Sequence, residues 1–200
     1  MPHPLIYKGL PITLCAVATA MFGVSLAQTD LGMKSASFDS VKPAEWTGKL
    51  RPSIGSASAA IKVVCFVDYE CPICRITDPL VRKAVAKRHD VALIYREFPL
   101  FVHQFAKSAA IVAENAREHG TFDVSHRRLM EGKSLTEASV KDAARKAGVS
   151  MIATPQTAAK LAADHDLEQK AKLSFVPTFV VIESGKITLL NRSQLLDFLK

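Results

Sequence analysis

Several features that would point to common functions are missing from this chain of 200 residues. Lys and Arg outnumber Asp and Glu by 26 to 19, but no long basic run occurs, so we expect no nucleic-acid partner. There is no glycine-rich phosphate loop, no internal repeat and no pair of acids at catalytic spacing. With 48% hydrophobic and 22% charged residues, the composition is that of a folded domain, not of a disordered or polytopic membrane chain.

Cysteine is scarce, with four residues in the chain, but Cys71 and Cys74 are separated by only two positions. This spacing occurs in half-sites for zinc, in structural disulfides and in redox-active disulfides. Zinc normally needs four ligands, and the chain offers no second pair, only Cys65 and scattered histidines. We therefore expect no metal and no other cofactor.

The first 27 residues have the features of a secretory signal peptide. Lys8 is their only Lys, Arg, Asp or Glu, and residues 10–26 form an apolar stretch that ends in small residues. We expect cleavage after Ala27 and export to the periplasm, an oxidising compartment in which nearby cysteines form disulfides. The alternative is an uncleaved membrane anchor, for which the apolar stretch is short.

The rest of the chain predicts alternating strands and helices after an N-terminal extension or linker at residues 28–58, which Trp46 fixes to the domain. β-Branched and aromatic runs predict strands at residues 61–67, 91–98, 175–182 and 186–190. Helical patterns predict helices at residues 75–88, with a kink or restart at Pro79, and at 104–118, 122–130, 155–172 and 193–200. A capping box of Ser134 and Glu137 predicts one more helix, which ends at Gly148.

This order predicts an α/β fold. A strand, a helix and a second strand form a right-handed crossover, which makes the two strands parallel, and the last two strands form an antiparallel hairpin. The sheet core is expected to consist of residues 59–102 and 173–200. Residues 103–172 are expected to form an inserted layer of four helices.

The CxxC sequence has a clear chemical interpretation in this fold. Cys71 falls at the N-terminus of a helix, where unpaired backbone N–H groups and the helix dipole stabilise a thiolate. Cys74 lies one turn deeper, close enough to form a disulfide but shielded from a substrate. A low pKa of Cys71 stabilises the reduced form and makes the disulfide a stronger oxidant.

Three motifs resemble the DsbA-like thiol:disulfide oxidoreductases of the thioredoxin-fold superfamily. In chain order they are Val67-Asp-Tyr-Glu-Cys-Pro-Ile-Cys74, Tyr95-Arg-Glu-Phe-Pro-Leu100 and Val176-Pro-Thr178. The similarity runs from about Gly55 to the C-terminus and implies a thioredoxin-like fold with an inserted helical subdomain. It further implies that Cys71 is the nucleophile and Cys74 the resolving cysteine. Pro177 would be a cis-proline facing them, with the Val176 backbone presented to an extended substrate peptide.

The chain departs from this family at Cys65, where relatives commonly carry a buried Asp or Glu that helps to move the proton of the buried cysteine. Cys65 is interpreted either as a small buried hydrophobic residue or as a third redox-relevant thiol. Without the acid, we expect proton transfer through water and slower turnover.

The leading functional hypothesis is an exported dithiol oxidase that introduces disulfides into cysteine-containing unfolded or folding proteins. The resemblance implies reoxidation by a membrane quinone-linked partner of the DsbB type. The alternatives are a disulfide isomerase or reductase, and a non-catalytic module that holds metals or peptides with its thiols. We expect His126 at the surface, and Phe101, Phe105 and Phe122 packed between the helices and the sheet, with some apolar surface left open around Cys71.

Overall fold

The computed structural model of the chain describes residues 40–200, so the predicted signal peptide and its cleavage position lie outside the described residues. The described strands are β1 (Ile61–Val67), β2 (Val91–Glu97), β3 (Thr178–Glu183) and β4 (Lys186–Leu190). The described helices are α1 (Pro43–Thr47), α2 (Pro72–Val85), α3 (Ala106–Glu118), α4 (Phe122–Met130), α5 (Glu137–Ala147), α6 (Pro155–Ala171) and α7 (Arg192–Phe198). None of these helices is long and apolar enough to cross a membrane.

The four strands form one mixed sheet in the order β2-β1-β3-β4. β1 pairs with β2 in parallel, with Ile61 opposite Val91, and pairs with β3 in antiparallel. β3 and β4 form an antiparallel hairpin. The predicted crossover and hairpin are therefore confirmed.

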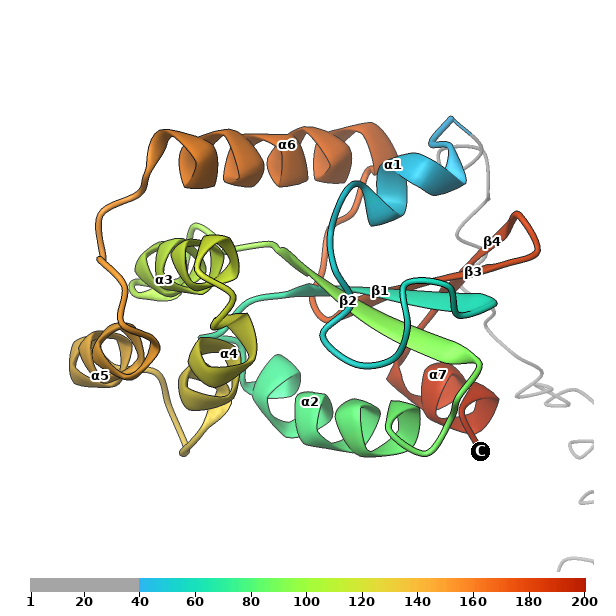
Figure 1. Ribbon diagram of the computed structural model, residues 1–200, viewed down its shortest axis with the longest axis horizontal. Helices are drawn as coiled ribbons and strands as arrows, with labels where there is room; N and C mark the ends of the chain where they lie inside the picture. Colours follow the sequence, from blue (N-terminus) through green and yellow to red (C-terminus); the bar gives the residue numbers. More distant parts are fainter. Residues whose placement is uncertain (1–39) are drawn as a thin grey trace, which may run out of the picture. The chain divides into compact units, whose positions relative to one another are not determined.

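Side chains that alternate along the strands build a separate core on each face of the sheet. On β1, Val63, Cys65 and Val67 join the core formed with α2 and α7, whereas Val64 and Phe66 join the core that contains Trp46. Figure 1 shows α2 and α7 on one face and α1 and α6 on the other. Burial on both faces explains why β1, β2 and β3 are nearly continuous apolar runs in the sequence.

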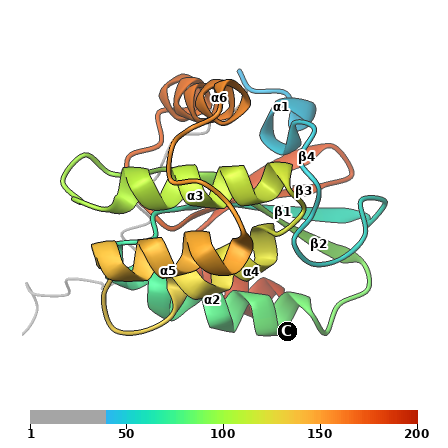
Figure 2. The same ribbon diagram turned by 60° about the vertical axis from the view of Figure 1, so that its left-hand side comes forward.

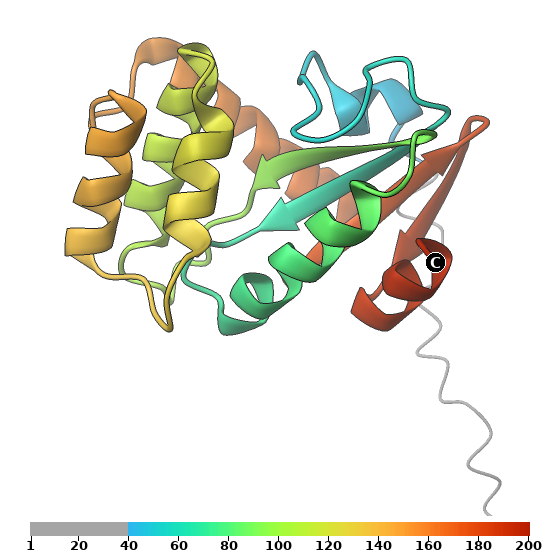
Figure 3. The same ribbon diagram turned by 60° about the horizontal axis from the view of Figure 1, so that its bottom comes forward.

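The helices inserted between β2 and β3 separate into two groups, rather than forming the single layer that the sequence predicts. α3, α4 and α5 pack against one another beyond the carboxyl ends of β1 and β2 (Figures 2 and 3). α6 instead covers the sheet face next to α1, where Leu167 and Ala171 enter the core. A buried ion pair between Asp164 of α6 and Arg96 of β2 ties this helix to the sheet.

Two helix starts differ from their predictions. α2 begins at Pro72 and continues through Pro79 without a restart, because Cys74, Val81 and Val85 pack on the sheet on both sides of the proline. α5 begins at Glu137, and its cap is Thr136 instead of Ser134. The Thr136 hydroxyl accepts the Ser139 amide at 3.2 Å, and the Ser139 hydroxyl accepts the Thr136 amide at 2.9 Å.

The segment before β1 is held against the domain. Trp46 is completely buried, and its carbonyl accepts the Arg96 Nε–H at 2.7 Å. Ile54 forms an antiparallel bridge with Leu93, so the segment also pairs with part of β2, the edge strand of the sheet.

The close approach of this segment to β2 can be tested at Gly55. Its φ is +83°, and a Cβ atom there would lie 2.2 Å from the Val91 carbonyl oxygen. We expect Gly55→Ala to lower the free energy of unfolding, measured by chemical denaturation, by more than Gly120→Ala does. Gly120 also has a positive φ, of +75°, but open space around its Cα, so its substitution should cost only the ~1–2 kcal/mol of the left-handed conformation. Equal losses in the two variants would contradict this packing.

Candidate active site

Cys71 lies at the junction between the sheet and α2. It is the N-cap of this helix, with extended backbone, and Pro72 occupies the first helical position, where a missing N–H costs nothing. The Cys71 amide donates to a carboxylate oxygen and to the carbonyl oxygen of Asp68, each at 3.2 Å. These contacts position the sulfur at the amino end of α2.

Several donors converge on the Cys71 sulfur and lower its pKa from 9.0 to about 6. The largest effect is the hydrogen bond from the Cys74 thiol, which outweighs the opposing effect of burial. The backbone N–H groups of Cys74 and Ile73 lower the pKa further, and the charge of Asp68 opposes them. At neutral pH, Cys71 is therefore predominantly a thiolate.

Cys74 has the opposite properties. It is 1% exposed, against 7% for Cys71, and hydrogen bonding to Cys71 together with burial raises its pKa far above the usual range. The structure contains Cys65, Cys71 and Cys74 as free thiols. The two sulfurs of the CxxC pair thus differ: the surroundings of Cys71 favour the thiolate, while those of Cys74 favour the neutral, buried thiol.

Val176 and Pro177 lie opposite this pair, in the segment that leads into β3. The peptide bond between them is cis, and the Val176 carbonyl oxygen is 3.8 Å from the Cys71 sulfur. The structure thus brings Cys71, Cys74, Val176 and Pro177 together at one site, and Cys65 borders the same cavity as Cys74 and Pro177.

Cys65 lies in β1, is 4% exposed, and borders a small cavity together with Cys74 and Pro177. Burial, followed by the charges of Asp78 and Glu97, raises the pKa of this thiol well above 9.0. Cys65 therefore stays protonated.

Asp68 and His103 are site residues that the sequence analysis missed. The buried Asp68 carboxylate accepts the Leu100 amide and His103 Nδ1–H, both at 2.8 Å. Burial lowers the pKa of His103, but the hydrogen bond and charge of Asp68 raise it by more, so the net shift is upward. The sequence held a signal for this contact, because both segments follow neighbouring parallel strands: Asp68 directly follows β1, and residues 98–105 follow β2.

Arg75 fixes the start of α2 against the end of α4. It is buried, and its guanidinium donates to the carbonyl oxygens of Tyr69 at 2.7 Å, Leu129 at 2.6 Å and Gly132 at 3.2 Å, and also to that of Glu131. The CxxC helix is therefore docked on both the sheet and the inserted helices.

His126 is not at the surface, and that prediction was wrong. It is completely buried on α4, with Nε2 3.0 Å from the Asp78 carboxylate and Nδ1 3.0 Å from the Tyr69 hydroxyl. Tyr95 stacks on its ring, with centroids 4.0 Å apart. The spacing of Phe122, His126 and Leu129 on one helical face was a signal that could have indicated burial.

Apolar side chains remain exposed near Cys71. We call Ile73, Phe101, Val102 and Phe175 the apolar rim; their exposed fractions range from 39% to 98%. Phe101 is the most exposed, so its predicted packing is wrong, whereas Phe122 is buried and Phe105 packs partly on the core. The neighbours of these residues show that the rim lies beside the site. Ile73 lies within CxxC, and Phe175 directly precedes Val176. Phe101 follows Leu100, whose amide donates to Asp68.

Within residues 40–200, no group of three or more His, Cys, Asp or Glu side chains is arranged to hold a metal ion.

The Cys71 thiolate can be tested by titrating the ultraviolet absorbance of the reduced protein. The midpoint should lie near pH 6, as the pKa of Cys71 is about 6. Cys74→Ala removes the strongest hydrogen bond to the sulfur and should raise the midpoint, while Cys65→Ser should leave it unchanged. Because the folded pKa lies below the unfolded value, ionisation stabilises the reduced protein above about pH 9, and this stabilisation is lost as the pH falls through about 6. A midpoint near 9 in the wild type would refute the assignment.

Comparisons with known proteins agree with this geometry. Residues 48–200 match the thioredoxin family. A thioredoxin-like oxidoreductase from Silicibacter pomeroyi DSS-3 is 28% identical, with a TM-score of 0.66 over 78% of this chain and 95% of that one. The catalytic domain of Proteus mirabilis ScsC is 25% identical, with a TM-score of 0.67 over 82% of this chain and 96% of that one. The thiol-disulfide exchange protein α-DsbA2 from Wolbachia pipientis, 15% identical with a TM-score of 0.63 over 83% of this chain and 94% of that one, shares the fold.

Among curated proteins, the Na⁺/H⁺ antiporter NhaA 3 of Salinispora tropica is 31% identical over 135 residues, which cover 64% of this chain and 21% of the antiporter. The chain thus spans about a fifth of the length of the curated relatives it matches. The family match over residues 48–200, together with the CxxC helix, the sheet order and the inserted helices, shows that the chain belongs to the thioredoxin family and has a DsbA-like fold.

Proposed function

We propose that this protein is an exported dithiol oxidase that introduces disulfides into cysteine-containing proteins. The observation that carries the proposal is the difference between the two sulfurs of CxxC: the pKa of Cys71 is lowered to about 6, while that of Cys74 is raised. Stabilising the Cys71 thiolate favours the reduced form, so the disulfide form accepts electrons readily.

The reaction follows from this difference. A client thiolate attacks the Cys71 sulfur of the Cys71–Cys74 disulfide, a bond forms between client and Cys71, and Cys74 leaves and takes up a proton. A second client thiolate then attacks the client sulfur of this mixed disulfide. The client disulfide forms and Cys71 leaves as the thiolate, for which its low pKa makes it a good leaving group. Two electrons pass from the client to the CxxC pair.

The surroundings of Cys71 suit an extended, unfolded client. The Val176 backbone, 3.8 Å from the sulfur through its carbonyl oxygen, is placed to bind a peptide backbone beside the reacting atoms. The apolar rim offers contact area to hydrophobic side chains that a folded protein would bury.

Turnover requires an oxidant for the reduced CxxC pair. By the resemblance to DsbA-like proteins, this is a membrane quinone-linked partner of the DsbB type, reached after export through the predicted signal peptide. A structural relative from Salmonella enterica serovar Typhimurium, 25% identical with a TM-score of 0.63, is described as a periplasmic thioredoxin-like protein, which supports the proposed compartment.

The direction of the reaction is tested by the reduction potential, measured by equilibrating the protein in glutathione buffers. We expect a value near about −120 mV, that of a strong oxidant, rather than near about −270 mV, that of thioredoxin. The Cys65→Ser variant should give the same potential, with mass spectrometry of the oxidised wild type showing only a Cys71–Cys74 bond. A value at the thioredoxin end would replace the oxidase with a reductase, and a Cys65 disulfide would make the third thiol part of the couple.

The apolar rim is tested with Phe101→Ser. Phe101 is 98% exposed, so the change should not disturb the fold, but the KM for a reduced, unfolded client should rise about fivefold through lost apolar contact. Oxidation of glutathione, which is too small to use the rim, should keep its wild-type rate. Ile152→Ser is the matched control, because Ile152 is 80% exposed in the connection between α5 and α6. If it raises KM as much, or if glutathione oxidation slows in the Phe101 variant, the rim is not the client site.

A further inference from the structure

A cavity beneath the CxxC pair contains a carboxylate that the reaction described so far does not use. The cavity is enclosed by β1, α2, β2, β3 and Pro177 just before β3, and its polar side chains are Cys65, Cys74, Thr77, Asp78 and Tyr95. Its volume of about 10 Å³ for the centre of a water molecule is close to what one water requires. β1 contributes a cysteine, Cys65, and no acid to this lining. Asp78 of α2 therefore supplies the only carboxylate among the residues lining the cavity.

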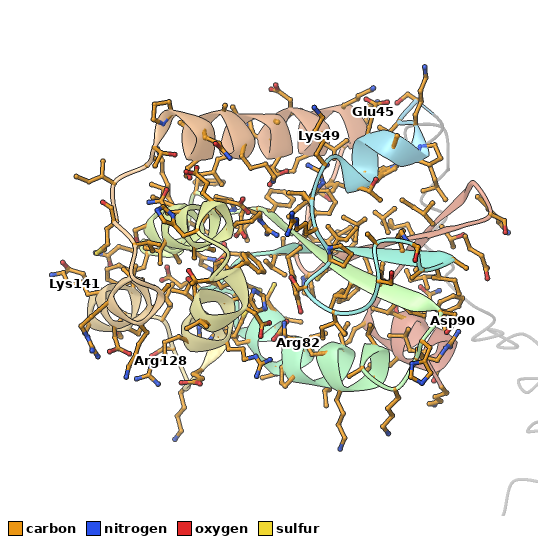
Figure 4. The ribbon with its side chains drawn as sticks, viewed as in Figure 1. Glu45, Lys49, Arg82, Asp90, Arg128 and Lys141 are labelled. Carbon is orange, nitrogen blue, oxygen red and sulfur yellow. The ribbon has the colours of Figure 1, made fainter. Side chains whose placement is uncertain are left out.

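The Asp78 carboxylate is held by side chains of β2 and α4. The Tyr95 hydroxyl donates to it at 2.5 Å, and His126 Nε2 lies 3.0 Å away. Burial raises the pKa of Asp78, but these two contacts and the charge of Arg82 lower it by more, so that it stays ionised. Arg82, labelled in Figure 4, forms an ion pair with Asp123 of α4.

Thr77 provides a second, independent indication of a polar occupant. Its side-chain oxygen is buried and has no hydrogen-bond partner within residues 40–200, although it borders the same cavity. A buried hydroxyl without a partner costs roughly 1–3 kcal/mol. One water in the cavity would satisfy Thr77 and at the same time bridge Cys74 and Asp78.

We propose that Asp78 exchanges the proton of the Cys74 thiol through a water in this cavity, a role that rests on the proposed thiol–disulfide exchange. When Cys71 is bonded to a client, the proton of Cys74 moves to the water, which gives a proton to Asp78. The Cys74 thiolate attacks the Cys71 sulfur, the Cys71–Cys74 bond forms, and the client leaves as a thiolate. Asp78 then returns its proton to solvent. In the oxidising direction, Cys74 leaves as a thiolate, and a proton from solvent reaches it by the same route, through Asp78 and the water.

The state of Cys71 decides when this transfer is possible. The main cause of the raised Cys74 pKa is its hydrogen bond to the Cys71 sulfur. In the mixed disulfide, the negative charge on Cys71 is gone, so Cys74 ionises more easily at the moment when its thiolate is needed. The groups that face Asp78 and influence its ionisation are Cys65 of β1, Cys74 and Arg82 of α2, Tyr95 of β2, His126 of α4 and Tyr69 of the loop before α2.

The experiment follows the reaction of reduced protein with dithionitrobenzoate, which gives one coloured thionitrobenzoate in each of two phases. The first phase is attack by Cys71, and the second is attack by Cys74 on the mixed disulfide. In Asp78→Asn, the second phase should slow by about tenfold, less than the roughly 10²–10⁴-fold of a base in direct contact because the effect passes through water. Its rate should also rise more steeply with pH than in the wild type, because hydroxide must then remove the proton. The first phase should be unchanged.

Asp123→Asn is the matched control, since it makes the same change at the carboxylate that pairs with Arg82, outside the cavity. It should leave both phases at wild-type rates. Cys65→Asp in the Asp78→Asn background places a carboxylate in the cavity from β1 and should restore part of the second phase. Thr77→Val, which removes a hydroxyl without a protein partner, should slow the second phase without loss of stability; it provides the test if Asp78→Asn fails to fold.

The outcomes separate the relay from the proposed function. If the wild type releases only one thionitrobenzoate, CxxC forms no internal disulfide and the proposed function itself fails. If the wild type completes both phases but Asp78→Asn and Thr77→Val match it, only the relay is wrong. Equal slowing of both phases would show a structural role for Asp78 and would also overturn the proposal.

Discussion

The buried carboxylate of Asp68 is the contact on which the geometry of the site depends. It accepts hydrogen bonds from the amides of Glu70, Cys71 and Leu100 and from His103. These bonds join the loop after β1 to the loop after β2, and so set where α2 begins. The same charge raises the pKa of Cys71 and so opposes the groups that lower it. The net shift is still downward, because the Cys74 thiol and two helix amides hydrogen-bond to the sulfur itself.

Polar groups also decide how α2 is placed relative to the inserted helices. Arg75 binds carbonyl groups at the end of α4, and Asp78 contacts His126 in the middle of that helix. A buried charge without partners costs several kcal/mol, so removing one member of such a set is more damaging than replacing the set with apolar residues. The contacts therefore restrict α2 and α4 to one relative position. The apolar packing of Val81 and Leu129 alone would specify this position less sharply.

The sequence was sufficient for the sheet, most helices and the CxxC pair, because each of these features is local. A run such as residues 61–67 is rich in β-branched residues, and Cys71 and Cys74 are three positions apart. The missed residues depend on contacts between distant segments: Asp68 with His103 is separated by 35 positions, and Asp78 with His126 by 48. The prediction that Phe101 is packed was wrong for a related reason. No local pattern distinguishes a phenylalanine that packs on the sheet from one that a neighbouring backbone contact, here at Leu100, holds out in solvent.

Two sulfurs separated by one helical turn need opposite environments, and the start of α2 supplies both. At the N-cap, Cys71 receives N–H groups that have no partner within the helix, and these groups stabilise its charge. Three residues later, Cys74 faces the sheet, where burial favours the neutral thiol. A neutral thiol is a poor nucleophile, so the arrangement that protects Cys74 also creates the need for a base beside it. α2 meets this need within its own next turn, since residues four apart share a helix face, and Asp78 follows Cys74 by four positions into the same cavity.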